Sequence, residues 1–203
     1  MIICLVTDRR RADPVAQARH AVRAGIDVLQ IRERDLEAAA LAAIVRDVLA
    51  VTRGSATRVL VNDRVDVTLA ASADGTHLRS DSLPTAAARQ LLPSPRLVSR
   101  SVHSAEELEH AEGCDFVLAG TVFPTSSKPG VDTWLDEHGL RAIVEAAAMP
   151  VVAIGGVTVD NVAGIARVGA AGIAAIGLFA HDRGFDETVR ALRSRFDSAK
   201  IGP

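Results

Sequence analysis

The sequence is poor in the residues on which nucleic-acid-binding and disulfide-rich proteins depend. Aromatic residues make up 3% of the 203 residues, with one Trp and no Tyr, so surfaces for base stacking are not expected. The 23 Lys and Arg residues are balanced by 25 Asp and Glu residues, which leaves no net positive charge to attract nucleic acid. The only cysteines, Cys4 and Cys114, lie in apolar runs and are too few for a disulfide scaffold. We therefore expect reduced, buried thiols and no nucleic-acid partner.

Long apolar stretches are also missing. No uncharged apolar stretch reaches the roughly 18 residues that a membrane-spanning helix requires. The segment MIICLVTDRRR has its apolar residues before its charges, the reverse of a secretory signal peptide. We accordingly expect a cytoplasmic protein with no membrane partner. With 48% hydrophobic and 24% charged residues, the chain has the ordinary composition of a globular protein with a buried core.

Short β-type segments recur along the whole chain. Most are continuous apolar runs, which are typical of strands in a parallel sheet that is buried on both faces. We expect strands at residues 3–7, 27–31, 58–62, 75–78, 96–99, 115–119, 150–154 and 172–176. Segments with helical spacing of apolar residues separate them, at 13–24, 35–51, 85–92, 104–112, 135–147, 161–168 and 186–196. In the first of these, Asp13 is the expected N-cap and Pro14 the first helical residue.

This alternation of strands and helices is compatible with a (β/α)8 barrel or an open doubly wound sheet. An open sheet more often has a Gly-rich phosphate loop after its first strand, but Thr7-Asp8-Arg9 follows that strand here. A length of 203 residues lies near the lower limit of barrels. We expect an α/β protein that forms a compact (β/α)8 TIM barrel. No linker rich in Pro, Gly and Ser divides the chain, so we expect a single domain over residues 1–203.

Glycine turns after the last two expected strands indicate a phosphate site. IGG follows the seventh strand at 154–156, and IGLF follows the eighth at 176–179. The loops after these strands form the common phosphate site of TIM barrels, where Gly lets backbone N–H groups approach phosphate oxygens. We expect Gly155, Gly156 and Gly177 to line this site. The alternative is that they only form tight turns.

Basic residues after the second and sixth strands predict a second anion site. Arg32 and Arg34 alternate along an extended segment and therefore share a face. Together with Lys128 they would clamp a diphosphate or a carboxylate. A surface ion pair between Arg34 and Glu37 is the alternative.

Polar residues at the ends of the third and fourth strands suggest a cation site and candidate acid–base groups. Mg²⁺ prefers one or two carboxylates together with substrate phosphates, and Asp63 and Asp81 would supply them. Alternatively, Asp63 caps the helix that begins near Val65. His77 and His103 lie near strand ends, where each is either an acid–base group or a structural histidine.

Five ordered segments resemble the thiamin phosphate synthases and their relative TenI, the thiazole tautomerase. They are QIRERD, VLVNDRVDVTLAASADGTHLRSD, SRSVHS, DFVLAGTVFPTSSK and PVVAIGGVTVDN, and the resemblance covers about residues 3–180. It implies a TIM barrel, a role in thiamin biosynthesis, and a small phosphorylated thiazole or pyrimidine ligand. The synthase joins hydroxymethylpyrimidine diphosphate to thiazole phosphate with Mg²⁺ and releases pyrophosphate.

The resemblance also implies roles for individual residues. Pyrophosphate binding falls on Arg32, Arg34, Asn62 and Lys128, the first Mg²⁺ ligand on Asp63, substrate contacts on Ser101 and Thr125, and the thiazole-phosphate loop on Gly156. Arg34 stands where the family has Lys, which keeps the charge and changes its geometry.

Two positions depart from the family patterns. The second Mg²⁺ ligand of the synthase falls on Ser82, and the catalytic His of the tautomerase falls on Thr121. If the segment around Ser82 is extended, Asp81 faces away from the position of Ser82, so we expect no strong Mg²⁺ site in the free protein and weak or absent synthase activity. The wording RERD at 32–35 and RSVHS at 100–104 is shared with TenI proteins.

These features narrowly favour an enzyme of the thiazole tautomerase type that requires no cofactor. The alternatives are a Mg²⁺-dependent thiamin phosphate synthase and a non-catalytic phosphate-ligand-binding or regulatory protein. We expect Arg32, Lys128 and His103 to be the catalytic residues, and Thr121 to contact the substrate. The sequence does not determine the oligomeric state, and a homo-oligomer is one of the possibilities.

Overall fold

Eight parallel strands close into a barrel in chain order, with β1 hydrogen-bonded to both β2 and β8. The structure is a computed structural model that describes residues 1–125, 133–181 and 183–201. The strands are β1 (Ile2–Val6), β2 (Val28–Ile31), β3 (Arg58–Asn62), β4 (Gly75–Leu78), β5 (Leu97–Val102), β6 (Phe116–Ala119), β7 (Val151–Ile154) and β8 (Gly172–Ala175). The closed barrel confirms the expected TIM-barrel fold, and every strand overlaps the segment expected for it.

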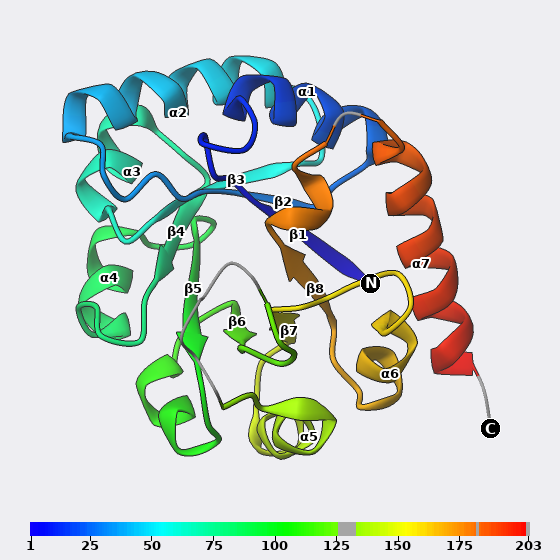
Figure 1. Cartoon of the computed structure of the whole chain (residues 1–203). Coiled ribbons are helices and arrows are strands. Elements are labelled where there is room, and N and C mark those ends of the chain that lie inside the picture. The colour runs from blue at the N-terminus through cyan, green and yellow to red at the C-terminus, as the bar shows by residue number, and fades with distance from the viewer. Residues whose placement is uncertain (126–132, 182, 202–203) are drawn as a thin grey trace.

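Helices surround the barrel on its outside (Figure 1). The α-helices are α1 (Pro14–Ala24), α2 (Ala38–Thr52), α3 (Val65–Ala71), α4 (Thr85–Leu91), α5 (Asp136–Ala146), α6 (Val162–Arg167) and α7 (Phe185–Ile201), and the 3₁₀ helices are η1 (Glu106–Ala111) and η2 (Gly177–Phe179). As expected, Pro14 begins α1 and the carboxylate of Asp13 caps it, accepting a 2.8 Å hydrogen bond from the N–H of Ala16. Within the described part of the chain, no helix is long and apolar enough to cross a membrane.

One helical segment differs from its expected form. A helix was expected at 104–112, but η1 is a six-residue 3₁₀ helix that begins at Glu106. Ala111 is its one buried residue. Because so little of the segment packs against the barrel, tertiary contacts do not stabilise a longer α-helix there.

The core has two layers because strand residues alternate between the two faces of the barrel wall. A large apolar layer fills the space between the barrel and its helices. A smaller cluster fills the barrel interior and consists of Cys4, Val6, Val28, Leu60, Phe116, Leu118, Val152 and Ala174. Both cysteines are free and buried, and burial raises the pKa of the Cys4 thiol to about 12. This confirms the expected free, buried thiols.

Candidate active site

A cavity of about 480 Å³ lies at the carboxyl ends of the strands, and residues from all eight strands or their following loops line it. Active sites of TIM barrels lie at this end. Among the sequence-predicted site residues, the cavity brings together Arg32, Arg34, Asn62, Ser101, His103, Thr121, Thr125, Gly155, Gly156 and Gly177. Asp63 does not line the cavity itself but lies beside Arg79, which does. Lys128 falls outside the described residues.

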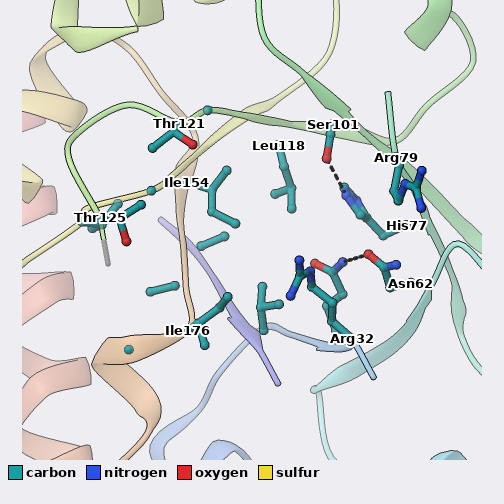
Figure 2. Close-up of a pocket in the computed structure, with 18 of the residues that line it drawn as sticks. Arg32, Asn62, His77, Arg79, Ser101, Leu118, Thr121, Thr125, Ile154 and Ile176 are labelled. Atoms are coloured by element: carbon teal, nitrogen blue, oxygen red, sulfur yellow. Dashed lines mark hydrogen bonds between the residues drawn. The ribbon is translucent and has the colours of Figure 1, made fainter. Parts of the chain in front are cut away.

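One half of the cavity floor, supplied by β2 to β5, is polar (Figure 2). The side-chain amide of Gln30 donates a 2.9 Å hydrogen bond to the Asn62 side-chain oxygen. The two ring nitrogens of His77 lie 2.9 Å from the hydroxyl oxygens of Ser99 and Ser101. These paired groups fix the orientation of the amide and the imidazole, which makes this half a rigid surface for polar recognition.

The imidazole of His77 is neutral at ordinary pH. Burial lowers its pKa to about 3, and the charges of Arg100 and Arg32 act in the same direction. A neutral imidazole has one donor and one acceptor nitrogen, and the two serine hydroxyls match this pair. His77 therefore serves this cavity as a fixed hydrogen-bonding group and not as a proton donor. Of the two interpretations from the sequence, the structure favours a structural histidine over an acid–base group, and this histidine also lines the cavity.

Three guanidinium groups line the cavity together with these polar side chains. Arg32, Arg34 and Arg79 all line the cavity, and Figure 2 shows Arg32 and Arg79 on either side of His77. Burial lowers the pKa of Arg32, and the charge of Arg34 lowers it further. Mutual repulsion of this kind favours the binding of a multiply charged anion between the groups. Among the described residues, Arg34 makes no ion pair with Glu37.

Arg79 links two carboxylates at the rim. Its Nε donates a 2.8 Å hydrogen bond to Asp81, and its Nη2 binds the second oxygen of the same carboxylate. Its Nη1 lies 3.7 Å from Asp63. An extended segment would have turned Asp81 away from the position of Ser82, but residues 80 and 81 form a turn. This turn brings Asp81, and not Ser82, to the cavity.

Asp63 adopts a backbone conformation that is unusual for a residue with a side chain. Its φ is +59°, a left-handed conformation that Asp tolerates better than most residues. Its N–H donates a 2.7 Å hydrogen bond to the carbonyl of His77. The N-cap of α3 is Arg64, and no side chain caps that helix, so the helix-cap alternative for Asp63 is wrong.

The carboxylates of Asp63 and Asp81 could supply some, but not all, of the ligands of a Mg²⁺ ion. Asp63 and Asp81 already share one cation, the guanidinium of Arg79. Across the described ranges, no group of three His, Cys, Asp or Glu residues could hold a metal. Mg²⁺ commonly binds through one or two carboxylates and takes its remaining ligands from water and substrate phosphates. The site therefore fits a Mg²⁺ ion that a bound diphosphate completes.

The other half of the cavity, from β6 to β8, has an apolar floor and glycine turns around it. Leu118, Ile154 and Ile176 lie on the opposite side from Asn62 and His77 (Figure 2). Thr121 and Thr125 lie beside these apolar side chains (Figure 2). An apolar ring of a ligand would pack here with its polar substituents at the turns.

The glycines of these turns have different structural roles. Gly156 has a φ of +63°, and a Cβ there would lie 2.4 Å from the carbonyl oxygen of Pro124. The backbone therefore requires glycine at this position. A Cβ at Gly177 would meet no atom closer than 3.8 Å, the Nη1 of Arg11. The protein itself leaves the space at Gly177 open, as expected where a ligand approaches the backbone.

Arg11 was missed as a cavity residue in the sequence, and Arg79 was given no role there. Both lie in loops beyond the strand ends, where strand periodicity carries no information about direction. The loop that carries Arg11 is attached to β2 through the buried carboxylate of Glu33. Glu33 accepts a 2.6 Å hydrogen bond from the hydroxyl of Thr7 and bonds of 3.1 and 3.2 Å from the N–H of Arg9. The run of three arginines at 9–11 is the one sequence feature that could have drawn attention to Arg11.

His103 lies at the exposed rim of the cavity. Its Nδ1 is 3.3 Å from a carboxylate oxygen of Glu107, and its backbone N–H donates a 2.8 Å hydrogen bond to the same oxygen. A histidine oriented by a carboxylate is a common arrangement for proton transfer. Among the described residues that line the cavity, His103 is the histidine in contact with solvent.

The closed barrel, its glycine turns after β7 and β8 and its opposing guanidinium groups have the form of the TIM barrels that bind phosphorylated small molecules. The chain belongs to the thiamine monophosphate synthase family, whose model matches residues 3–179. It is 42% identical over 185 residues to the thiamine-phosphate synthase of Methanoregula boonei, covering 90% of this chain and 86% of the relative. The thiamine-phosphate synthase of Anaeromyxobacter dehalogenans is 45% identical over 170 residues, covering 81% of this chain and 75% of the relative.

A solved structure shows the same arrangement. The thiamine phosphate pyrophosphorylase of Pyrococcus furiosus superposes with a TM-score of 0.86 at 32% identity, covering 99% of this chain and 97% of that structure. The family expected from the five segments is thus confirmed. The names of these relatives favour the synthase, which the sequence alone placed second, over the tautomerase.

Proposed function

We propose that this protein is a thiamin phosphate synthase, which joins hydroxymethylpyrimidine diphosphate to thiazole phosphate and releases pyrophosphate. The observation that carries the proposal is that one cavity has two separate anion-binding ends. The turns at Gly156 and Gly177 form one end, and Arg32, Arg34 and Arg79 form the other. A tautomerase acts on a single thiazole carboxylate phosphate, whose carboxylate brings one negative charge to a cluster of three guanidinium groups. A synthase binds two phosphorylated substrates and uses both ends.

The polar half suits the pyrimidine diphosphate. Asn62, His77 and Ser101 present fixed donors and acceptors to the pyrimidine ring, and the guanidinium groups bind its diphosphate. During the reaction, the bond between the pyrimidine's methylene carbon and the diphosphate oxygen breaks, and a bond from that carbon to the thiazole ring forms. Negative charge grows on the departing pyrophosphate, and fixed guanidinium groups stabilise it. Arg32 is the central group because it is the more buried of the two arginines that follow β2.

The apolar half suits the thiazole phosphate. The ring would pack on Ile154 and Ile176, which line the cavity with Gly156 and Gly177. The phosphate would bind at the two glycine turns, where backbone N–H groups would be the donors. The phosphate at one end and the diphosphate at the other keep both rings over the same floor. Such positioning reduces the entropic cost of bringing two substrates together.

Asp63 and Asp81 would hold a Mg²⁺ ion. When bound, the ion supplies positive charge that neutralises the diphosphate. In the ligand-free protein Arg79 already lies between the two carboxylates. We therefore expect Mg²⁺ to bind weakly alone and more tightly with the diphosphate.

The second candidate function is the thiazole tautomerase, and the pair of His103 and Glu107 favours it. These two side chains could exchange a proton with a ligand at the rim. In this case the guanidinium cluster would bind the carboxylate of the thiazole substrate, and the pyrimidine diphosphate would not bind.

A thermal-shift series distinguishes these functions, because the stabilisation of the folded protein rises with the logarithm of the ligand concentration relative to its Kd. The series compares thiazole phosphate, thiazole carboxylate phosphate, and hydroxymethylpyrimidine diphosphate with and without Mg²⁺. A synthase is stabilised by the pyrimidine diphosphate, more so with Mg²⁺, and additionally by thiazole phosphate. Stabilisation by thiazole carboxylate phosphate alone would favour the tautomerase and contradict the proposal.

A further inference from the structure

Arg100 is a buried cation in the barrel wall, only 2% exposed. Its neighbours in β5, Ser99 and Ser101, point into the barrel, where both contact His77. Because side chains alternate along a strand, Arg100 points outward, between the barrel and α4. A charged group is rarely buried in such a layer unless its hydrogen bonds are satisfied there.

Within the described residues, every hydrogen bond that the Arg100 side chain donates goes to the segment that leads from β4 into the first residue of α4. Nη1 donates 3.0 Å bonds to the carbonyls of Arg79 and Ser80, and Nη2 donates to the carbonyl of Leu83. Nε lies 3.2 Å from the hydroxyl of Thr85, the first residue of α4. None of these four acceptors is a carboxylate. The guanidinium therefore acts as a fork that holds three backbone carbonyls and one hydroxyl in a fixed arrangement.

The connection held in this way is the one that carries Arg79 and Asp81. In the β4–β5 ladder Arg100 is the partner of Leu78, the last residue of β4. The Arg100 guanidinium therefore lies next to the point where the chain leaves β4. The turn at residues 80 and 81 is what brings both charged side chains to the cavity. Without the Arg100 guanidinium as their hydrogen-bond donor, the carbonyls of this turn would be free to rotate toward water.

We propose that Arg100 is a positioning residue that fixes the loop of residues 79–84, so that Arg79 and Asp81 face the cavity. It does not itself line the cavity, so it acts on a bound diphosphate through Arg79 and not by contact. The inference rests on the proposed function in one respect, namely that Arg79 binds a diphosphate. The fixation of the loop itself does not depend on that function.

The chain offers a matched control in Arg89. It donates hydrogen bonds to the carbonyls of Gly113, Leu92 and Arg96 and pairs with Asp115. These residues precede β5 and β6, at the opposite end of the barrel from the cavity. Removal of Arg89 therefore removes an arginine of similar hydrogen bonding without disturbing the loop of residues 79–84.

The first test is amide hydrogen exchange on the ligand-free protein. Arg100→Met should raise the exchange rates of residues 79–84 by about tenfold or more, since local opening loses the fork that opposes it. Arg89→Met should leave these rates unchanged and speed exchange near residues 92–96 and 113–115. Unchanged exchange at 79–84 in a folded Arg100→Met protein would overturn the inference.

The second test is a double-mutant cycle with Arg79→Ala, using calorimetric binding of inorganic pyrophosphate. If Arg100 acts through Arg79, Arg100→Met weakens binding about tenfold in the parent, as expected for the loss of one charge-assisted contact. In the Arg79→Ala background the same change has less than about a twofold effect. An equal loss in both backgrounds would show that Arg100 acts by its own charge, and would overturn the inference.

A conservative variant covers the case in which Arg100→Met does not fold. Arg100→Lys keeps the charge but cannot reach all four acceptors, so its exchange rates and pyrophosphate affinity should lie between those of the parent and complete loss. Parent-like values for both would show that charge alone suffices and would contradict positioning. If the parent protein binds no pyrophosphate, the proposed function fails, and the exchange experiment still decides the role of Arg100.

Discussion

At the scale of single residues, the cavity shows that one residue type can be required for two different reasons. Gly156 is required by the protein, because a side chain there would meet the Pro124 carbonyl at 2.4 Å. Gly177 is not required by any neighbour within 3.8 Å. The sequence predicted that both glycines face a phosphate site. Only the backbone geometry shows that Gly177 leaves open space and that Gly156 also maintains the turn.

This difference predicts opposite results for two alanine variants. Gly177→Ala should change the free energy of unfolding by less than about 0.5 kcal/mol and weaken thiazole-phosphate binding about tenfold by steric exclusion. Gly156→Ala should destabilise the protein by about 1–3 kcal/mol because the backbone must shift. Urea unfolding and calorimetric titration measure the two effects. A Gly177→Ala protein that binds thiazole phosphate as tightly as the parent would contradict this assignment.

Arg32 should be the residue on which diphosphate binding depends most. Arg32→Ala removes a charge-assisted donor worth about 1.5–3 kcal/mol, so pyrophosphate affinity should fall about ten- to a hundredfold. Arg58→Ala is the control, because Arg58 is exposed at the start of β3, paired with Asp74. Calorimetry on both variants checks the prediction. Equal affinities in Arg32→Ala and Arg58→Ala would exclude a role for Arg32 in anion binding.

His77 should make stability depend on pH. Its pKa is lowered from 6.5 to about 3 in the folded protein, so the unfolded chain binds its proton at higher pH. The stability contributed by the neutral imidazole is therefore complete above pH 6.5 and is lost as the pH falls toward 3. This group alone contributes a slope of up to about 1.4 kcal/mol per pH unit.

Urea unfolding between pH 5 and 6.5 tests this, since carboxylates titrate mainly at lower pH. His77→Gln retains hydrogen-bonding groups toward Ser99 and Ser101 but does not titrate. Its free energy of unfolding should change less with pH than that of the parent. Parallel pH profiles for the two proteins would show that His77 is not the buried neutral group.

At the scale of elements, the sequence predicted the strands and the cavity residues attached to them. Continuous apolar runs define β1 to β8, and the polar residue after each run lies at one end of a parallel barrel. The loops were less predictable because their direction depends on tertiary contacts. Asp81 faces the cavity since the loop turns above Arg100, and no local pattern of residues encodes that contact. Arg11 likewise depends on the attachment of its loop to Glu33.

The loop between β1 and α1 should depend on Glu33. Glu33→Ala leaves the Thr7 hydroxyl and the Arg9 N–H without their acceptor, which should cost about 2–3 kcal/mol in the free energy of unfolding. Affinity for thiazole phosphate should also fall, because Arg11 on this loop loses its position beside Gly177. Glu37→Ala is the control, since the Glu37 side chain makes no capping hydrogen bond to α2. Equal stability of the two variants, measured in urea, would contradict this role of Glu33.

At the scale of the whole molecule, the barrel divides its cavity between two chemistries. Strands β2 to β5 supply amide, imidazole and hydroxyl groups, and strands β6 to β8 supply apolar side chains and glycine turns. Candidate anion-binding groups accompany each half, guanidinium groups in the first and glycine turns in the second. One closed barrel thus has a suitable half of its cavity for each of the two substrates of the proposed reaction. This division follows from the register of the strands, which places alternate residues of each strand toward the axis.

The most direct test of this account is the reaction itself. Purified protein is mixed with hydroxymethylpyrimidine diphosphate, thiazole phosphate and Mg²⁺, and thiamin phosphate and pyrophosphate are quantified by chromatography. The account predicts that both products form in equal amounts and that Asp63→Asn strongly reduces the rate. Absence of thiamin phosphate, together with conversion of a thiazole carboxylate phosphate into its isomer, would contradict the synthase assignment.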